Sequence, residues 1–359
     1  MLPDHPPVPV YFAPIEECRD FTRIERRFKD LLNCAEFEQY VPDKGLVAVK
    51  THFGEKNSIT HIPPRIFKPL AARIKQAGGR PFLTETSTLY KGSRSDTIVH
   101  CELAHNHGFT LENTAMPVIM SDGLNGGFEA EIAINGELCK KVAIAGLLPG
   151  IHGLVCASHP TGHVKFGFGG AIKNLGMGLS SRKGKMTMHS SIKPYIKPEK
   201  CAKCGYCMQW CPEDAIIEIN GIIRILGEKC IGCGECLTQC RFDAVAYNWE
   251  TGSEEIQKLT AEHALGVVKG KKVFFINYFI NFTKDCDCFG TAKTPIIRDF
   301  GILASPDPVA IDTACLDLIE QREKRPLNTL TYPGIDPRIQ VQHAEKIGLG
   351  SQTYKIITC

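Results

Sequence analysis

The sequence contains no hydrophobic run long enough to cross a membrane. Its most apolar stretch, Val273–Phe282, is much shorter than the roughly 20 residues that a spanning helix needs. At the N-terminus, Met1–Pro7 shows no charged segment followed by an apolar run, which a secretion leader would have. These absences predict a soluble, cytoplasmic protein without a membrane partner.

The chain also lacks a block of one charge and a regular disulfide framework. Its 42 lysines and arginines are interspersed with 39 aspartates and glutamates, which leaves a net charge of +3. A nucleic-acid-binding surface needs clustered basic residues, so we expect no nucleic-acid partner. Cysteine is abundant at 17 residues, but those outside two dense runs are scattered. This usage indicates a reducing compartment.

Eight cysteines fall into two runs that share one spacing. The first run consists of Cys201, Cys204, Cys207 and Cys211, and the second of Cys230, Cys233, Cys236 and Cys240. The spacing C-x₂-C-x₂-C-x₃-C, present twice, is typical of bacterial ferredoxins with two [4Fe–4S] clusters, in which the last cysteine of each run ligates the other cluster. We therefore predict that Cys240 joins the first three cysteines and that Cys211 joins the second three.

The two halves of this segment repeat one another with a shift of 29 residues, which maps Asp214–Ile216 onto Asp243–Val245. Two related units, each covering one face of a cluster, explain the repeat. Zinc is the alternative, but a zinc site of four ligands fits triple C-x₂-C-x₂-C runs poorly.

The second run is followed by Arg241 and not by proline. A cation beside Cys240 would favour the reduced cluster and raise its potential.

Apolar segments on both sides of these runs alternate between strand and helix patterns. Strand patterns occur at Leu46–Val49, Arg80–Thr84, Pro117–Met120, Gly153–Ala157, Val273–Tyr278 and Gly301–Ala304. Helical patterns occur at 18–37, 66–77, 95–108 and 253–270, and another follows Asp307. Ser95, Ser253 and Asp307 are the predicted caps of their helices, and residues 129–145 show a hairpin pattern. Strand, helix and strand at this spacing predict βαβ units and a parallel sheet.

The predicted architecture is therefore an α/β fold with a mainly parallel sheet and an inserted bacterial-type 2[4Fe–4S] ferredoxin unit of the α+β class. Residues 1–195 and 248–359 form one discontinuous α/β domain, and residues 196–247 form the insertion. Two separate flanking domains are the alternative, but the roughly 110 residues after the insertion would make a small independent one.

A glycine-rich stretch follows the predicted strand at 153–157, where open α/β sheets place ligands. Its cofactor-binding candidates are Gly167, Gly169, Gly170, Lys173 and Asn174, and its catalytic candidates are His159, His163 and Lys173, with Lys165 adding positive charge. Backbone N–H groups that open a helix can hold an anion. A glycine-rich turn with loop histidines is the plain alternative, because the spacing of a dinucleotide-binding motif is absent.

Cys286 and Cys288 follow the predicted strand Val273–Tyr278 and are further catalytic candidates. Residues two apart in an extended segment point the same way, so the pair could hold a metal, contact a redox centre or cycle between dithiol and disulfide. Two small buried residues are the alternative. The adjacent Asp285 and Asp287 should raise the pKa of the thiols, which argues against a simple nucleophile.

A third segment with titratable side chains also follows a strand. Lys50, His52 and Glu55 suit substrate binding or proton transfer, although solvated loop charges are an equal alternative. Cys101 and His105 lie four residues apart on a predicted helix. They lack a second pair of ligands, which favours packing over metal binding.

Three segments together resemble one family: Gly167–Gly178, Cys286–Gly290 and Gly301–Asp312. They are similar to the iron–sulfur branch of the uncharacterised family known as domain of unknown function 362, as is the position of the Cys-rich runs. The resemblance extends from about Leu46 to Tyr354. It implies an α/β protein with an inserted 2[4Fe–4S] unit, and it assigns no reaction.

Two interpretations of function follow. The preferred one is an oxidoreductase that relays single electrons from a redox partner protein, through two [4Fe–4S] clusters, to a site on the α/β domain. The acceptor would be an anionic small-molecule substrate, a flavin or an additional metal. The alternative is a non-catalytic electron-transfer partner or a maturation factor that passes electrons or a metal to another protein. A pocket at the glycine-rich stretch favours the enzyme, and an exposed cysteine pair on a flat apolar surface favours the partner.

Overall fold

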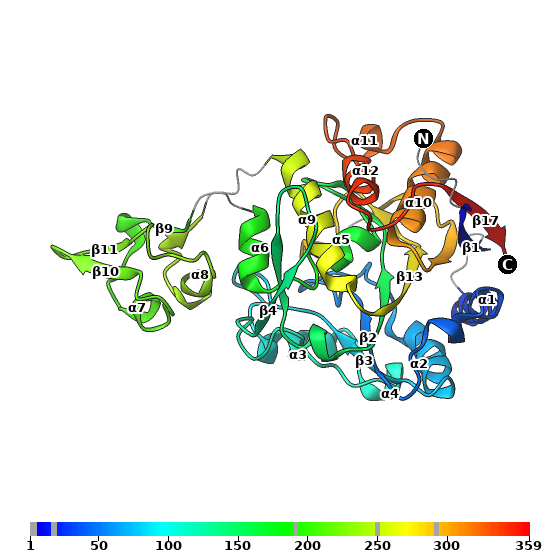
Figure 1. Ribbon diagram of the computed structural model, residues 1–359, viewed down its shortest axis with the longest axis horizontal. Helices are drawn as coiled ribbons and strands as arrows, with labels where there is room; N and C mark the ends of the chain where they lie inside the picture. Colours follow the sequence, from blue (N-terminus) through cyan, green and yellow to red (C-terminus); the bar gives the residue numbers. More distant parts are fainter. Residues whose placement is uncertain (1–5, 16–19, 190–192, 248–251, 291–293) are drawn as a thin grey trace.

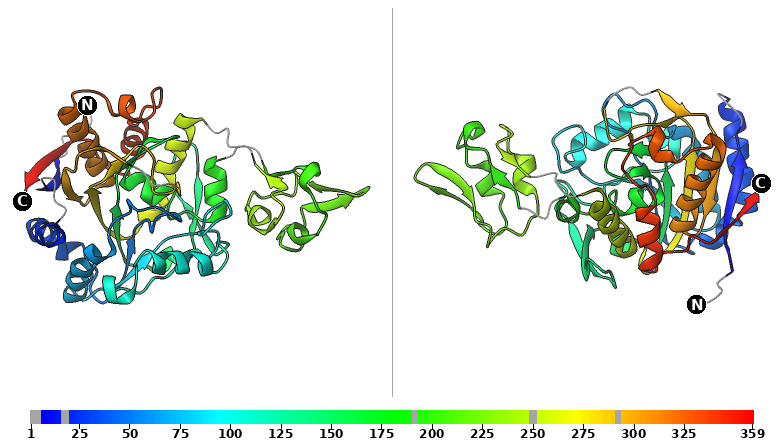
Figure 2. Two further views of the ribbon diagram at one scale, coloured as in Figure 1. Left: turned by 180° about the vertical axis from the view of Figure 1, so that it is seen from behind. Right: turned by 90° about the horizontal axis from the view of Figure 1, so that it is seen from above.

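The protein consists of a large α/β body and a smaller Cys-rich unit at one end of it (Figure 1). The computed structural model describes residues 6–15, 20–189, 193–247, 252–290 and 294–359. The Cys-rich unit extends from the same end of the body when the molecule is seen from behind and from above (Figure 2). The body is built from chain segments on both sides of this unit.

A seven-stranded sheet forms the centre of the body, in the order β17–β1–β16–β13–β6–β2–β3. The strands are β1 (Val8–Pro14), β2 (Leu46–Lys50), β3 (Arg80–Thr84), β6 (Gly153–Ser158), β13 (Lys272–Phe279), β16 (Gly301–Ser305) and β17 (Tyr354–Thr358). Neighbouring strands pair in parallel except at β16, which is antiparallel to both β1 and β13. The prediction of a mainly parallel sheet is confirmed.

The sheet is covered on both faces. Side chains of successive residues point to opposite faces of a strand, so one strand contributes to the core on each side. Along β13, Phe275 and Phe279 belong to one hydrophobic core, whereas Phe274, Ile276 and Tyr278 belong to the other. The apolar runs of the central strands are therefore continuous and not alternating, as expected for strands buried on two faces.

Helices cover each face. The first core contains α5 (Ala171–Gly176), α9 (Ser253–Val268), α10 (Pro308–Glu323) and α12 (Ile339–Lys346), and the second contains α1 (Phe21–Cys34), α2 (Phe67–Gln76) and α3 (Thr97–Asn106). Helix α4 (Leu111–Thr114) packs against α2. The body also contains α6 (Arg182–His189), α11 (Leu327–Leu330), β4 (Glu129–Ala133), β5 (Lys141–Ala145), β7 (Thr161–His163), β8 (Gly167–Gly169), β14 (Phe282–Thr283), β15 (Pro295–Ile297) and the short 3₁₀ turns Phe37–Tyr40, Pro64–Ile66 and Leu148–Gly150. Across the described residues, no helix combines the length and the apolarity needed to cross a membrane.

The three predicted helix caps agree with the structure to within a residue, whereas α1 begins three residues later than predicted. Asp307 caps α10, because its side chain accepts hydrogen bonds from the first N–H groups of the helix. Helix α3 is capped by Asp96 and not by the preceding Ser95. Ser253 is the first residue of α9 and not its cap, since the cap position is Gly252.

The edges of the sheet and one disulfide depart from the sequence prediction. No strand was predicted in the proline-rich start or at the end of the chain. These segments form β1 and β17, which pair with one another, and β1 also pairs with β16. Pro117–Met120 was expected as a strand and makes only an isolated bridge to β3. Cys34 and Cys359 form a disulfide, whereas these residues were expected to be scattered thiols.

The Cys-rich unit contains two copies of one backbone motif. Its elements are β9 (Tyr195–Ile196), a 3₁₀ turn (Pro198–Lys200), α7 (Tyr206–Gln209), β10 (Ile216–Ile219), β11 (Ile222–Ile225), α8 (Glu235–Gln239) and β12 (Val245–Ala246). Gly205 and Gly234 precede the two helices with the same φ of 77°. Asp214 and Asp243 also match, with φ of 46° and 52°. The 29-residue repeat of the sequence is thus a repeat of the backbone.

A buried carboxylate on α10 holds α5 in place. Asp312 accepts hydrogen bonds from the N–H groups of Ala171 and Ile172 at 2.8 and 2.9 Å and from the Asn277 amide at 2.9 Å. Gly170 precedes α5, and a Cβ there would lie 2.3 Å from the Asp312 Oδ1 atom. Burial raises the pKa of Asp312 to about 6, although the hydrogen bonds from these three donors act to lower it.

Replacing Asp312 by asparagine should remove a pH dependence of stability. The folded-state pKa of about 6 exceeds the value of about 3.9 for an unfolded aspartate, so the folded protein binds more protons between these values and loses stability as pH rises through them. Two pKa units correspond to about 3 kcal/mol. The stability of wild type relative to Asp312→Asn, measured by denaturant unfolding, should therefore fall by about 2–3 kcal/mol between pH 4 and pH 7. The neighbouring Thr313→Val is a non-ionisable control, and a constant difference for Asp312→Asn would contradict the expectation.

Candidate functional site

The carboxyl ends of β2, β3, β6 and β13 meet around a cavity of about 760 Å³. These strands are adjacent and parallel, so the segments that follow them emerge at one edge of the sheet. Residues from 50–56, 85–94, 158–178 and 286–290 line the cavity. Its size suits a small molecule or a cofactor.

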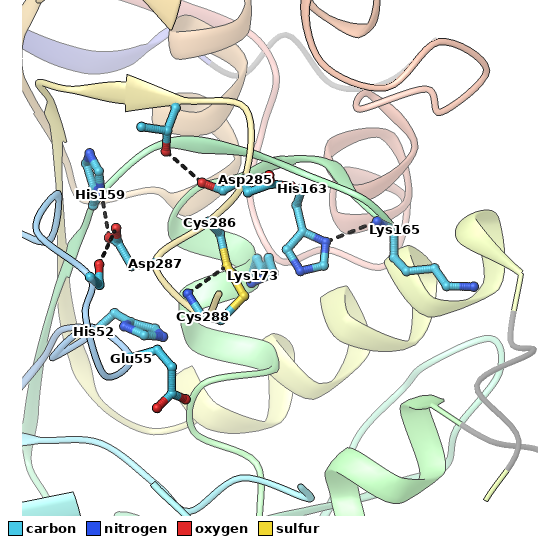
Figure 3. The surroundings of a disulfide bond; sticks show 12 residues. His52, Glu55, His159, His163, Lys165, Lys173, Asp285, Cys286, Asp287 and Cys288 are labelled. Atoms are coloured by element: carbon cyan, nitrogen blue, oxygen red, sulfur yellow. Dashed lines mark hydrogen bonds and ion pairs between the residues drawn. A yellow bond between two sulfur atoms is a disulfide. The ribbon is translucent and has the colours of Figure 1, made fainter. Parts of the chain in front are cut away.

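Two segments that are far apart in the sequence come together in the cavity wall. Cys286 and Cys288 are joined by a disulfide, and the Lys173 Nζ atom lies 3.8 Å from the Cys286 Sγ atom (Figure 3). The ammonium group of Lys173 also lies over the ring of Phe166, 5.5 Å from its centroid. Lys173 and the cysteine pair therefore share one pocket, as their positions after two strands led us to expect.

His163 lies beside the cysteine pair. One of its ring nitrogens and the two sulfurs all lie within 4.8 Å of one another, a spacing that would let the three groups bind one metal ion if the cysteines were reduced. The His163 Nδ1 atom accepts a hydrogen bond from the N–H of Lys165 at 3.1 Å. A neutral His163 therefore carries its proton on Nε2.

Both ring nitrogens of His159 face acceptors. Nδ1 lies 2.6 Å from an Asp287 carboxylate oxygen, and Nε2 lies 2.6 Å from the carbonyl oxygen of Ile280. Both contacts are hydrogen bonds at once only when each ring nitrogen carries a proton. His159 was expected to be catalytic, and the structure places its ring between Asp287 and Ile280. His159 positions the Cys286–Cys288 segment against the end of β6.

The carboxylates that flank the cysteines are engaged elsewhere. Asp287 pairs with His159 and accepts a hydrogen bond from the Thr60 hydroxyl at 2.7 Å. Asp285 accepts a hydrogen bond from the hydroxyl of Tyr332. The sequence suggested that both charges would act on the thiols, and each carboxylate has a hydrogen-bond partner of its own. Lys173 places a cation beside the Cys286 sulfur.

A network of buried charges forms another part of the wall. Lys50 pairs with Glu85 at 2.5 Å, and both side chains are buried. Arg94 contacts a carboxylate oxygen of Glu55 and the Nε2 atom of His52, each at 2.9 Å. Burial and the nearby Arg94 and Lys50 cations lower the pKa of His52 well below its usual value. Lys50, His52 and Glu55 thus belong to the site and are not solvated loop charges.

Sequence reasoning missed Glu85 and Arg94. Both lie in the segment after β3, which carries no motif of its own. The predicted parallel sheet could have indicated them, because parallel neighbouring strands end at the same edge of the sheet. The segment after β3 therefore had to lie beside the segments that follow β2 and β6. The pairing of Glu85 with Lys50 depends on that arrangement and on no local pattern.

Helix α5 positions two of the predicted residues in different ways. Asn174 accepts a hydrogen bond from Lys50 Nζ at 2.7 Å and donates one to the Ser158 hydroxyl at 2.9 Å. Lys173 points into the cavity, and burial, together with the Arg94 and Lys50 cations, lowers its pKa to about 8. Asn174 therefore orients the wall, whereas Lys173 is placed to meet a ligand.

The glycines of the predicted anion loop serve packing. Gly169 and Gly170 line the cavity, and Gly167 does not. The N–H groups that open α5 already bind the Asp312 carboxylate, so they are not available to an external anion. Close approach also explains Gly176, where a Cβ would lie 2.0 Å from a backbone oxygen of α9.

Cationic side chains outnumber carboxylates in the cavity lining. The lysines and arginine are Lys50, Lys56, Lys91, Arg94, Lys165, Lys173 and Lys185, and the carboxylates are Glu55, Glu85 and Asp287. Burial lowers the pKa of Lys185 to about 8, and burial and Lys173 lower that of His189 to about 3. An anionic ligand would relieve this concentration of positive charge.

Each quartet of cysteines surrounds its own small cavity. One cavity is lined by Cys201, Cys204, Cys207 and Cys240, and the other by Cys211, Cys230, Cys233 and Cys236. In both cavities the fourth cysteine comes from the other run. The N–H groups of Ala215 and Ala244 donate hydrogen bonds to the sulfurs of Cys211 and Cys240, each at 3.2 Å.

The sulfurs of each quartet are not gathered as they are around a bound zinc ion. Four sulfurs bonded to zinc at about 2.3 Å would lie about 3.8 Å from one another. Among the described residues, three such ligand atoms come within 4.8 Å of one another only at His163, Cys286 and Cys288. The quartet sulfurs are therefore farther apart than in a formed zinc site.

The Cys-rich unit contacts the wall of the large cavity. Arg182 on α6 forms an ion pair at 3.2 Å with Glu235, which directly precedes Cys236, and Arg182 is 1% exposed. Arg182 also donates a hydrogen bond to the carbonyl oxygen of Ser95 at 2.7 Å. Leu89 lines the large cavity and belongs to the same buried cluster as Cys236.

The fold and these sites define an α/β protein with a Cys-rich unit beside a ligand-sized cavity. A family model described as "Domain of unknown function (DUF362)" matches residues 47–317, and the chain belongs to this family. No curated protein sequence matches it significantly. A solved structure, "Structure of the lactate racemase apoprotein from Thermoanaerobacterium thermosaccharolyticum", aligns with a TM-score of 0.39 at 13% identity, over 76% of this chain and 50% of that chain.

Replacing Glu85 by glutamine should destabilise the fold, because it leaves the Lys50 ammonium buried without its carboxylate partner. Breaking one side of a buried ion pair costs about 3–5 kcal/mol. The free energy of unfolding, measured with a chemical denaturant, tests this expectation. Glu25→Gln removes an exposed pair with Lys29 and should cost little, since solvent screens such pairs. Equal losses for the two variants would contradict the role of the buried pair.

Proposed function

We propose that this protein is an iron–sulfur oxidoreductase in which electrons pass, one at a time, through two [4Fe–4S] clusters to a substrate or cofactor in the large cavity. The observation that carries the proposal is the pair of cavities that are each lined by four cysteines. Residues 196–247 would then be a ferredoxin unit inserted in the α/β domain. This would place the chain in an iron–sulfur branch of its family.

The cysteine quartets have the surroundings that a cluster needs. Clusters of this type supply one-electron transfer, commonly at low potential. The N–H groups of Ala215 and Ala244 point at ligand sulfurs and would stabilise the negative charge gained on reduction. The Arg182–Glu235 ion pair and Leu89 hold the unit against the cavity wall, which supports a short path between the two sites.

The cavity supports an acceptor that is bound inside the protein. Cys286 is 6% exposed and Cys288 is partly buried, so the pair does not lie on a flat exposed surface. The excess of cationic side chains supports an anionic small molecule, and Phe166 and Met177 add apolar walls that suit a planar group such as a flavin. A soluble redox partner protein in the reducing cytoplasm would supply the electrons.

A second candidate is a maturation factor that transfers a metal. The observation in its favour is the compact group of His163, Cys286 and Cys288. Two thiolates and an imidazole suit soft or borderline metals, and three protein ligands leave a position open for transfer. In this case the cavity would hold the metal in transit and not a substrate.

Iron content tests the main proposal. Anaerobically reconstituted protein should hold about eight iron and eight sulfide per chain. Cys240→Ser should lose about four irons, because Cys240 completes the site of Cys201, Cys204 and Cys207. Cys101→Ser, which changes a cysteine of α3, is the control and should lose none. Stoichiometric zinc, or only four irons in wild type, would rule the proposal out.

Arg241 should raise the reduction potential of the cluster that Cys207 and Cys240 would ligate. Its guanidinium lies over the ring of Tyr206, 4.6 Å from the centroid, and Tyr206 directly precedes Cys207. Arg241→Gln removes a cation that favours the reduced cluster, so the potential of the cluster held by Cys207 should fall. Redox titration followed by electron paramagnetic resonance measures it, with Arg224→Gln as a control for net charge. An unchanged or higher potential would show that solvent screens the charge.

A further inference from the structure

The Cys286–Cys288 disulfide lies in the wall of the large cavity, where a bound molecule can reach it. We propose that this pair is a redox-active dithiol/disulfide centre that exchanges two electrons with a small anionic thiol or disulfide in the cavity. The proposal does not require the iron–sulfur clusters, since it rests on the residues of the cavity alone. It gives the cavity a two-electron chemistry of its own.

The two sulfurs have different surroundings. Cys286 is 6% exposed, whereas Cys288 is partly buried at the cavity wall. An incoming thiolate can therefore approach the Cys288 Sγ atom more readily than the Cys286 Sγ atom. Attack on one sulfur of a disulfide expels the other as a thiolate. Cys286 is thus placed as the leaving group.

Two donors stabilise negative charge on the Cys286 sulfur. The N–H of Cys288 donates a hydrogen bond to it at 3.3 Å, and the Lys173 Nζ atom lies 3.8 Å away (Figure 3). A stabilised thiolate leaves faster in exchange. The Asp287 carboxylate, which would oppose this charge, is paired with His159.

The atoms and electrons of the exchange balance, and the thiol is the only external reactant that the exchange needs. In the first step a thiolate bonds to the sulfur of Cys288, the Cys286–Cys288 bond breaks, and the electron pair remains on Cys286. In the second step another thiolate attacks the bound sulfur of the first and expels the sulfur of Cys288. Two external thiols become one disulfide, and their two electrons and two protons reduce the protein disulfide to two thiols. The reverse steps oxidise the pair.

The charges of the cavity select the partner. Lys173, Lys185 and Arg94 lie in the same lining as the cysteines, so a thiol with a negatively charged group should bind better than a neutral one. A metal ion is the competing occupant of the pair. The Nδ1 atom of His163 already accepts the N–H of Lys165, so a bond from Nε2 to a metal would require that hydrogen bond to be given up.

The test uses the full chain with its clusters, held anaerobically in buffers of reduced and oxidised glutathione or dithiothreitol. After alkylation, trypsin releases residues 285–293, a peptide in which Cys286 and Cys288 are the only cysteines, and its mass reports the fraction of disulfide. We expect a reversible two-electron transition. Mercaptoethanesulfonate should reduce the pair several-fold faster than mercaptoethanol at low salt, and the difference should shrink at high salt.

Lys173→Gln tests whether Lys173 stabilises the thiolate of Cys286. Without the ammonium group the thiolate is less stable, so the equilibrium should move toward the disulfide by about tenfold, which is about 30 mV. Lys284→Gln changes an exposed lysine next to the segment and should not shift the equilibrium. In this variant trypsin releases residues 273–293, in which Cys286 and Cys288 are again the only cysteines. The Cys34–Cys359 disulfide provides an internal control, because it lies outside the cavity and should respond to neither variant.

Each remaining outcome would overturn the proposal. A pair that stays oxidised in excess dithiothreitol is a structural disulfide. A pair that stays reduced in oxidised glutathione with a stoichiometric metal ion attached is a metal site. Equal shifts in Lys173→Gln and Lys284→Gln would show that net charge, and not the contact with Cys286, sets the equilibrium. Iron analysis of every variant separates loss of the clusters from loss of the thiol chemistry.

Discussion

The fixed position of helix α5 is the constraint on which the site depends. The helix is only six residues long and could not persist alone in water. The Asp312 carboxylate holds its first turn from α10 and also binds Asn277 of β13. Lys173, which meets the Cys286 sulfur, and Asn174, which orients Lys50, are placed by this anchoring. One buried acid therefore determines where two parts of the cavity wall lie.

The cavity concentrates positive charge on buried side chains, among them Lys50, Arg94 and Lys185. Glu85 and Glu55 neutralise part of it through Lys50 and Arg94, and these pairs hold the segments after β2 and β3 together. Lys173 instead contacts a sulfur and an aromatic ring. A site of this kind favours anions and stabilises thiolates for the same electrostatic reason. The proposed ligand binding and the proposed sulfur chemistry would thus depend on one charge distribution.

The Cys-rich unit and the cavity meet through a small set of contacts. The buried Arg182–Glu235 pair is costly to break once formed, and it joins a residue beside Cys236 to the helix that follows the glycine-rich stretch. Leu89 reaches both the cavity and the cysteine cluster. Through these contacts the cysteines of the unit and the Cys286–Cys288 pair of the cavity belong to neighbouring parts of the structure.

The sequence alone determined the features that depend on neighbouring residues: the strands β2, β3, β6 and β13, the Asp307 cap, the two cysteine runs with their 29-residue repeat, and the candidates Lys173, Cys286 and Cys288. Only the tertiary structure decided the direction of β16, the pairing of β1 with β17, the ion pair of Lys50 with Glu85, and the contacts of His159 with Asp287 and Ile280. Periodicity and spacing are local properties of the chain. Which side chains meet depends on how strands far apart in sequence lie side by side in the sheet, and no local pattern records that order.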